Sequence, residues 1–102
     1  MPTFLYAQEA ALPWIWDPEK DEVNRRKPGL PLAVGAAVMD DPLLLSRPDE
    51  HPDGNRWFSI GVLNGVAVAV IHTWPDDDEI DGRVISVRQA TKKERKAYED
   101  GD

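Results

Sequence analysis

Cysteine is absent from this chain of 102 residues, so neither a disulfide framework nor thiol chemistry is available to it. No apolar run approaches the ~20 residues of a membrane-spanning helix. Residues 1–12 contain no Lys or Arg, which is not typical of a signal peptide. The length suffices for one domain with one modest core. We therefore expect a single-domain protein of the cytoplasm.

Positive charge is also scarce, because 12 Lys and Arg face 19 Asp and Glu, a net charge of −7. This balance argues against a general nucleic-acid-binding protein. The charges are unevenly distributed, however, and residues 76–81 form an acidic run. Salt screens charges beyond about 8–10 Å, so a local basic patch can persist on an acidic protein. Half of the cations lie close together near the C-terminus: Arg83, Arg88, Lys92, Lys93, Arg95 and Lys96.

The segment that contains these cations is predicted to be a strand followed directly by a helix. Arg83–Arg88 is rich in Val and Ile, which favours a strand. Thr91 and Glu94 have the spacing of a capping box, so a helix should begin at Lys92. Two arginines on a strand beside a basic helix can hold a phosphate backbone. The alternative is a solvated basic helix with no ligand.

Local signals define the other elements. Residues 1–13 look like an accessory segment, and Trp14–Trp16 predicts a short strand. Asp17 and Pro18 begin a helix that runs to about Lys27. Leu32–Met39 is a second helix candidate, and residues 43–45 are a candidate edge strand.

Asn64 and Gly65 form the strongest short hairpin signal in the chain, between strands predicted at 55–63 and 66–74. A two-residue turn pairs residue 60 with 69, 57 with 72, and 56 with 73. The last strand should then return antiparallel beside residues 66–74. The prediction is an α+β domain over residues 14–102, with an antiparallel sheet of three to four strands, two N-terminal helices and a short C-terminal helix.

The ordered set of motifs resembles the BrnT family of bacterial toxins over residues 14–99. The Ile-Ser-x-Arg-x-Ala-Thr sequence of residues 85–91 is its most specific part. The motifs are Trp16–Lys20, Asn24, Arg26-Lys27-x-Gly29, Asp41-Pro42, Arg56, Ile60-Gly61, His72-Thr73, Ile85-Ser86, Arg88, Ala90-Thr91, Glu94 and Tyr98.

This resemblance implies a RelE-like fold and a ribonuclease that blocks translation without a metal or other cofactor. It also implies neutralisation by a BrnA-type antitoxin, whose ribbon-helix-helix part binds DNA, so that the toxin meets DNA only indirectly. The chain departs from the family pattern at Pro28, where His is usual, and at Asn55, where an acidic residue is usual. Gln89 replaces a frequent Arg, and residues 1–13 are extra.

A metal-independent ribonuclease needs a base for the 2′-hydroxyl, cations for the phosphorane and an acid for the leaving oxygen. Arg88 and Arg56 match the family pattern and are the first candidates for clamping phosphate, because a guanidinium binds its oxygens bidentately. Arg83 is the third candidate. The resemblance favours Arg56 with Arg88, whereas hairpin geometry favours Arg56 with Arg83. A surface ion pair is the alternative role for each.

Lysines supply the remaining candidates. Lys27 is the candidate base, because neighbouring arginines lower the pKa of a lysine; its alternative role is to complement the helix dipole. Lys20 is assigned to RNA binding on the same helix, together with Lys92, Lys93 and Lys96.

Other reactive side chains have a structural reading. His72 could act as acid or base, but packing against Trp57 is the favoured interpretation. Glu94 is assigned to the helix cap. Tyr98 could stack on a base or pack in the core. No metal site is expected, because the acidic residues lack a spaced His or Cys partner.

Three functions remain open at this point: an active toxin ribonuclease, a toxin-like protein that binds its antitoxin without catalysis, and an interaction domain unrelated to nucleic acid. The departures at Pro28 and Asn55 motivate the second, and the net charge motivates the third.

Overall fold

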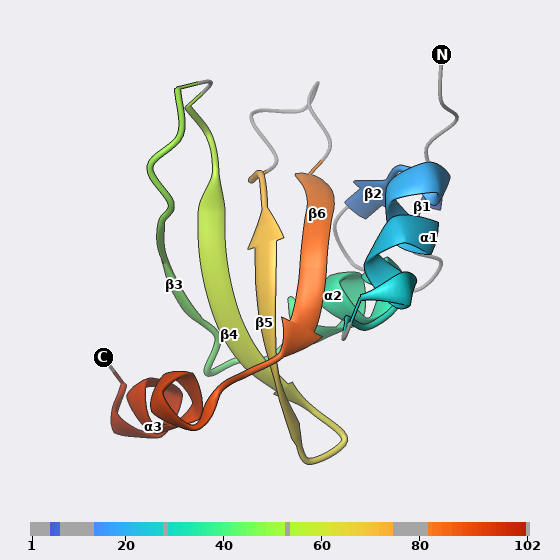
Figure 1. Ribbon diagram of the computed structural model, residues 1–102. Helices are drawn as coiled ribbons and strands as arrows, with labels where there is room; N and C mark the ends of the chain where they lie inside the picture. Colours follow the sequence, from blue (N-terminus) through green and yellow to red (C-terminus); the bar gives the residue numbers. More distant parts are fainter. Residues whose placement is uncertain (1–4, 7–13, 28, 53, 75–81, 102) are drawn as a thin grey trace.

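The computed structural model describes residues 5–6, 14–27, 29–52, 54–74 and 82–101, so Pro28 and the acidic run 76–81 lie outside the described residues. Its strands form one sheet in the order β1-β2-β6-β5-β4-β3 (Figure 1). The strands are β1 (Leu5–Tyr6), β2 (Trp14–Trp16), β3 (Leu45–Pro48), β4 (Trp57–Leu63), β5 (Val66–His72) and β6 (Gly82–Gln89). The helices are α1 (Pro18–Arg26), α2 (Leu32–Val38) and α3 (Lys92–Asp100).

The hairpin of β4 and β5 confirms the prediction made from its turn. Asn64 and Gly65 have φ of 52° and 80°, the positive values that a tight two-residue hairpin turn requires. Ile60 pairs with Ala69 and Trp57 with His72, as the register predicts. Because β6 then runs antiparallel beside β5, the hairpin occupies the centre of the sheet.

The predicted number and direction of strands was wrong in part. The sheet is mixed, because β2 pairs parallel with β6, through Trp14 with Gly82 and Ile15 with Arg83. The sequence of a strand as short as β2 does not indicate which strand it pairs with. Its partner depends on where Trp14 and Trp16 are buried in the folded protein, among residues far away in the sequence. The edge strand also lies at Leu45–Pro48 instead of residues 43–45, and Leu43 is 72% exposed. Proline is tolerated on an edge strand, which needs no donor on its outer side.

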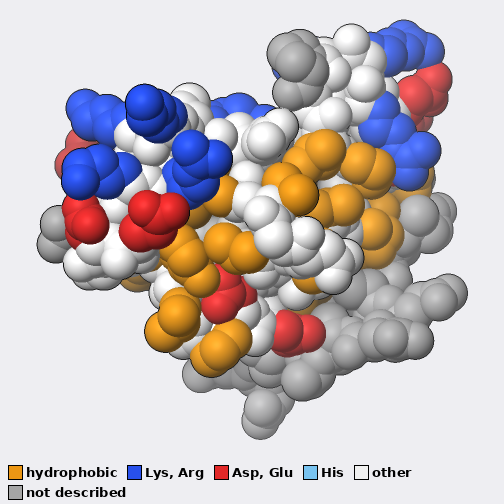
Figure 2. All heavy atoms as spheres, turned by 90° about the horizontal axis from the view of Figure 1, so that it is seen from below, with side chains coloured by type: hydrophobic (Ala, Val, Ile, Leu, Met, Phe, Trp, Pro, Cys, Tyr) orange, Lys and Arg blue, Asp and Glu red, His pale blue; other side chains and the backbone are white. Residues whose placement is uncertain are grey.

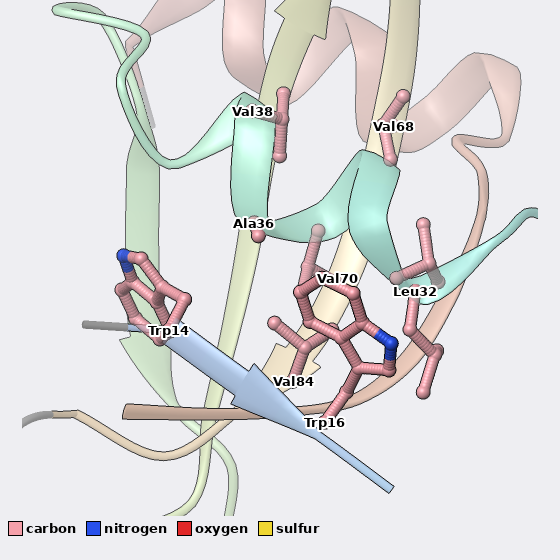
Figure 3. Packing of buried hydrophobic residues seen from close by; sticks show 9 residues of the cluster. Trp14, Trp16, Leu32, Ala36, Val38, Val68, Val70 and Val84 are labelled. Atoms are coloured by element: carbon pink, nitrogen blue, oxygen red, sulfur yellow. The ribbon is translucent and has the colours of Figure 1, made fainter. Parts of the chain in front are cut away.

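The core lies between the sheet and α2, with β2 contributing its tryptophans. Trp14 and Trp16 point toward Val70, Val84 and Ala36 of this cluster (Figure 3). Gly35 allows the close approach, because a Cβ built there would lie 2.6 Å from Cγ2 of Val87. Gly35 therefore lies within α2 because any side chain there would collide with the sheet.

Helix α1 begins as predicted, since the Asp17 carboxylate accepts a hydrogen bond from the Glu19 amide and Pro18 occupies the first turn. Its buried side chain is Asn24, whose Nδ2 donates to the carbonyls of Leu30 (2.5 Å) and Val87 (2.8 Å). Asn24 thus fastens a polar helix to the edge of β6.

Helix α3 lies on the sheet face opposite α2, where it contacts β4 (Figure 1). Alternation along β5 explains the two faces: Val68 and Val70 face the core, whereas Ala69 and its neighbours Ile60 and Arg88 face the other way. The predicted α+β class, with two N-terminal helices and a C-terminal helix, is confirmed. Among the described residues, no helix is long and apolar enough to cross a membrane.

Candidate functional site

Arg88 is held in a bidentate ion pair with Glu94 on the α3 side of the sheet. Its Nη1 lies 2.6 Å from Oε1 of Glu94, and its Nη2 lies 2.9 Å from Oε2. The Arg88 backbone is set by its place in β6 opposite Ala69. Two parallel hydrogen bonds fix both the direction and the plane of the guanidinium.

Glu94 is itself held by the cap of α3. Its Oε1 accepts a hydrogen bond from the Thr91 amide at 2.9 Å, and its own amide donates to Oγ1 of Thr91 at 3.1 Å. The predicted capping box is therefore confirmed. The Arg88 hydrogen bonds, outweighing partial burial and aided by the Thr91 amide, lower the pKa of Glu94 to about 2. The carboxylate is ionised at neutral pH and supports Arg88 as well as the helix.

Arg88 keeps an edge of its guanidinium available to a ligand. The side chain of Glu94 is 17% exposed while that of Arg88 is 44% exposed, so the pair presents its cationic half to solvent. The outer side of Nη1 faces the Gln89 carbonyl at 3.4 Å. On the edge formed by Nε and Nη2, Nη2 donates one hydrogen bond to Glu94, and Nε has no hydrogen-bond partner among the described residues. That edge can donate two parallel hydrogen bonds to phosphate oxygens.

The predicted RNA-binding lysines of α3 lie on exposed positions next to Arg88. Figure 2 shows Lys and Arg side chains gathered on the left, over α3, with exposed hydrophobic side chains beside them. Lys92, Lys93 and Lys96 are exposed, and Lys96 pairs with Asp100 at 3.5 Å. This basic helix carries cations that can follow a phosphate backbone away from Arg88.

Lys20 and Lys27 are exposed on α1, at the other edge of β6. Lys27 caps the C-terminus of α1, and three residues later the Leu30 amide donates to the Val87 carbonyl at 3.0 Å. The contact with β6 next to Arg88 is therefore made by Leu30, and no hydrogen bond or ion pair between Lys27 and Arg88 occurs among the described residues. Lys20 lies in the first turn of the helix, further from this contact.

Arg56 and Arg83 lie at the opposite end of the sheet from Arg88. The Thr73 amide donates to the Arg83 carbonyl at 2.9 Å, and Arg56 precedes the Trp57–His72 pair. Arg88 pairs with Ala69 of β5, whereas the register of β4 aligns Arg56 with Thr73, the residue after β5, so Arg56 and Arg88 are offset by four residues, about 13 Å, along the strands. The geometry favours Arg56 with Arg83, as the hairpin predicted. It does not place Arg56 and Arg88 on one phosphate, the pairing that the resemblance favoured.

Arg56 and Arg83 are both half-buried. Nε of Arg83 is buried and has no hydrogen-bond partner among the described residues. The acidic run that could pair with it, residues 76–81, lies outside them. Asn55, beside Arg56, is bonded to the backbone of Trp74: its side chain accepts from the Trp74 amide and donates to the Trp74 carbonyl.

His72 is excluded from direct chemistry by complete burial, which agrees with the packing interpretation. Its Nε2 lies 2.6 Å from Oγ of Ser59, and its Nδ1 lies 2.9 Å from the Thr73 carbonyl. Trp57 is its strand partner, but the ring contacts are with Trp14 at 5.5 Å and Trp74 at 4.9 Å. Burial, partly offset by the Thr73 hydrogen bond, lowers the pKa of His72.

One cation of the α3-side face, Arg47, escaped the sequence analysis. Arg47 lies opposite Phe58 across β3 and β4, with its guanidinium carbon 5.0 Å from the ring centroid. The hairpin register alone predicts that Phe58 shares the face of Arg56, but the contact with Arg47 required the position of β3. Tyr98 also has a defined role, since its hydroxyl donates to Oδ2 of Asp41 at 2.7 Å and ties α3 to the end of α2. No group of His, Asp and Glu suited to a metal occurs within the described residues.

The fold and the site define a small α+β protein with a cationic surface, centred on one ordered arginine, that suits a polyanion. The model of the family described as the ribonuclease toxin BrnT of type II toxin–antitoxin systems matches residues 16–94. The chain therefore belongs to the BrnT family of ribonuclease toxins. The family implies an antitoxin protein as partner. Comparison with curated proteins finds no match.

Proposed function

We propose that this protein is a RelE-like endoribonuclease toxin that inhibits translation by cleaving RNA without a metal ion. The observation that carries the proposal is the fixed, solvent-facing guanidinium of Arg88 beside the basic helix α3, in a chain of the BrnT family. Residues 14–102 form the toxin domain, and residues 1–13 are an accessory segment. Because its substrate would be translated RNA, its place of action is the cytoplasm.

The proposed chemistry uses the RNA's own 2′-hydroxyl as nucleophile. Its oxygen attacks the adjacent phosphorus, the 2′-proton passes to a base, and the 5′-oxygen leaves with a proton, which yields a cyclic phosphate. Arg88 stabilises the phosphorane through its free edge. Lys27, at the C-terminus of α1 and three residues before the Leu30–Val87 contact, is the proposed base.

The other cations bind the substrate at a distance from the reacting phosphate. Lys92, Lys93 and Lys96 follow the backbone along α3, and Lys20 contacts it from α1. Arg56 and Arg83 lie at the far end of the sheet, so we assign them phosphates further along the same RNA.

The proposal is tested by Arg88→Ala and its matched control Lys93→Ala. Loss of one transition-state donor costs about 2.7–4 kcal/mol, a hundred- to thousand-fold in rate, so Arg88→Ala should abolish toxicity. Lys93→Ala should only weaken RNA binding and reduce its salt dependence. Cleavage should continue in EDTA and leave a cyclic phosphate end. An Arg88→Ala variant as toxic as the parent, or cleavage that stops in EDTA, would contradict this mechanism.

The proposed partner is a BrnA-type antitoxin with a ribbon-helix-helix DNA-binding part. It would cover the basic surface of α3 and leave its own DNA-binding part free, so the complex meets DNA only through the antitoxin. Co-expression with the neighbouring gene product should give a single species on gel filtration. Elution of the toxin as a free monomer would refute this assignment.

A second candidate function is a toxin-fold protein that binds its antitoxin without cleaving RNA. Asn55 favours it, because the side chain at the position where the family usually has an acidic residue is an uncharged amide hydrogen-bonded to the backbone of Trp74. Induced expression without the neighbouring gene separates the two functions: growth arrest supports the ribonuclease, and normal growth at a matched protein level supports the binding protein.

A further inference from the structure

Among the described residues, only Glu94 accepts hydrogen bonds from both terminal nitrogens of Arg88, Nη1 and Nη2. A helix cap by itself needs only one oxygen of this carboxylate, which accepts from the Thr91 amide. The second oxygen, Oε2, is bonded to Nη2 of Arg88. Glu94 therefore does more than begin the helix.

The arrangement of the pair decides which edge of Arg88 is open. Glu94 meets the guanidinium end-on, through Nη1 and Nη2, and leaves the side-on edge of Nε and Nη2 without another partner among the described residues. Both oxygens of the carboxylate are anchored, and its side chain is mostly covered. Without this anchor, the long side chain of Arg88 would rotate freely and lose rotamer entropy each time it met a phosphate.

We propose that Glu94 is a positioning residue, which holds the Arg88 guanidinium so that its side-on edge meets the reacting phosphate during cleavage. This inference rests on the proposed ribonuclease function. The positioning role is the opposite of a masking role, in which Glu94 would block Arg88 until RNA displaced it. A phosphate on the side-on edge leaves the end-on pair intact, so nothing has to be displaced.

The two roles predict opposite changes when the charge of Glu94 is removed. Glu94→Gln keeps one amide oxygen for the Thr91 cap but loses the charge-assisted bidentate pair. Misplacing a reactive group costs on the order of a hundred-fold in rate, so the cleavage rate constant should fall by that order. Affinity for RNA should stay the same or rise, because a negative charge beside the phosphate has been removed.

The test measures both quantities on the full chain. Single-turnover cleavage of an RNA oligonucleotide containing all four bases gives the rate, and its 2′-O-methyl analogue, which cannot be cleaved, gives the affinity. Asp100→Asn is the matched control, because it removes the same charge from α3 at a carboxylate that pairs with Lys96 and not with Arg88. It should leave the cleavage rate unchanged.

A merely structural role for Glu94 would lower the folded fraction, and rate and binding amplitude would fall together. A Glu94→Gln variant that cleaves as fast as the parent, or faster, would overturn the proposal. The double variant Glu94→Gln/Arg88→Ala should be no slower than Arg88→Ala alone, because Glu94 acts through Arg88.

Nitrogen NMR of the Arg88 side chain provides a readout that does not depend on cleavage. Rotation about the Nε–Cζ bond should be hindered in the parent and in Asp100→Asn, and fast in Glu94→Gln. Free rotation in the parent would overturn the positioning role. A parent with hindered rotation that leaves RNA intact would instead refute the proposed ribonuclease function.

Discussion

The buried histidine should make the stability of this protein depend on pH near neutrality. His72 is 0% exposed and lies in a chain of hydrogen bonds that joins Ser46, Ser59 and the Thr73 carbonyl. With Nδ1–H donating to Thr73 and Nε2 accepting from Ser59, the neutral ring satisfies both nitrogens. A proton on Nε2 would reverse the Ser59 contact and place a charge among Trp14 and Trp74.

The expected magnitude follows from proton linkage. Burial lowers the pKa of His72 from its ordinary 6.5, so the unfolded chain binds a proton that the folded chain does not. Stability is therefore full above pH 6.5 and falls as the pH is lowered, by about 1.4 kcal/mol per pH unit for one proton. The loss ends when the pH passes the folded-state pKa. Glu94 titrates in a lower window, because its pKa of about 2 is reached from an unfolded value of 4.5.

Urea unfolding followed by tryptophan fluorescence between about pH 7.5 and about pH 5.5 measures this slope. His51→Gln leaves His72 as the only histidine of the chain, so the slope measured in this variant is assigned to His72. His72→Gln should lose it; if that variant does not fold, NMR titration of the His72 ring in the parent provides the same test. Equal stability at both ends of the range, or a ring that titrates at its ordinary pKa, would refute the reasoning.

Two further predictions concern the attachments of α1 and α3. Asn24→Ala removes the donor to the buried Val87 carbonyl and should lower the free energy of unfolding by about 1–3 kcal/mol, and Asn24→Asp by more, because it adds a buried charge; equal urea midpoints would contradict this. Thr91→Ala should cost about 1 kcal/mol and reduce activity only through stability. Lost activity at an unchanged melting temperature would show that Thr91 belongs to the site.

The candidate site was predicted as a set of residues, and the structure separates that set in space. Arg88 directly precedes the α3 lysines, Lys27 lies at the end of α1, and Arg56 and Arg83 lie at the other end of the sheet. The hairpin register implied this separation, and the resemblance pointed elsewhere. An ion pair was the alternative role predicted for Arg88, but Glu94 was not predicted as its partner, because Glu94 had already been assigned to the cap of α3.

The sequence by itself determined the elements whose signals are local. The Asp17-Pro18 cap, the Asn64-Gly65 turn and the Thr91 capping box each involve residues within a few positions, so their geometry hardly depends on the rest of the chain. Only the tertiary structure decided the parallel pairing of β2 with β6 and the attachment of Asn24 to Val87, 63 residues away. Such contacts exist because burying tryptophan and valine side chains brings distant segments together, and no local preference encodes which segments meet.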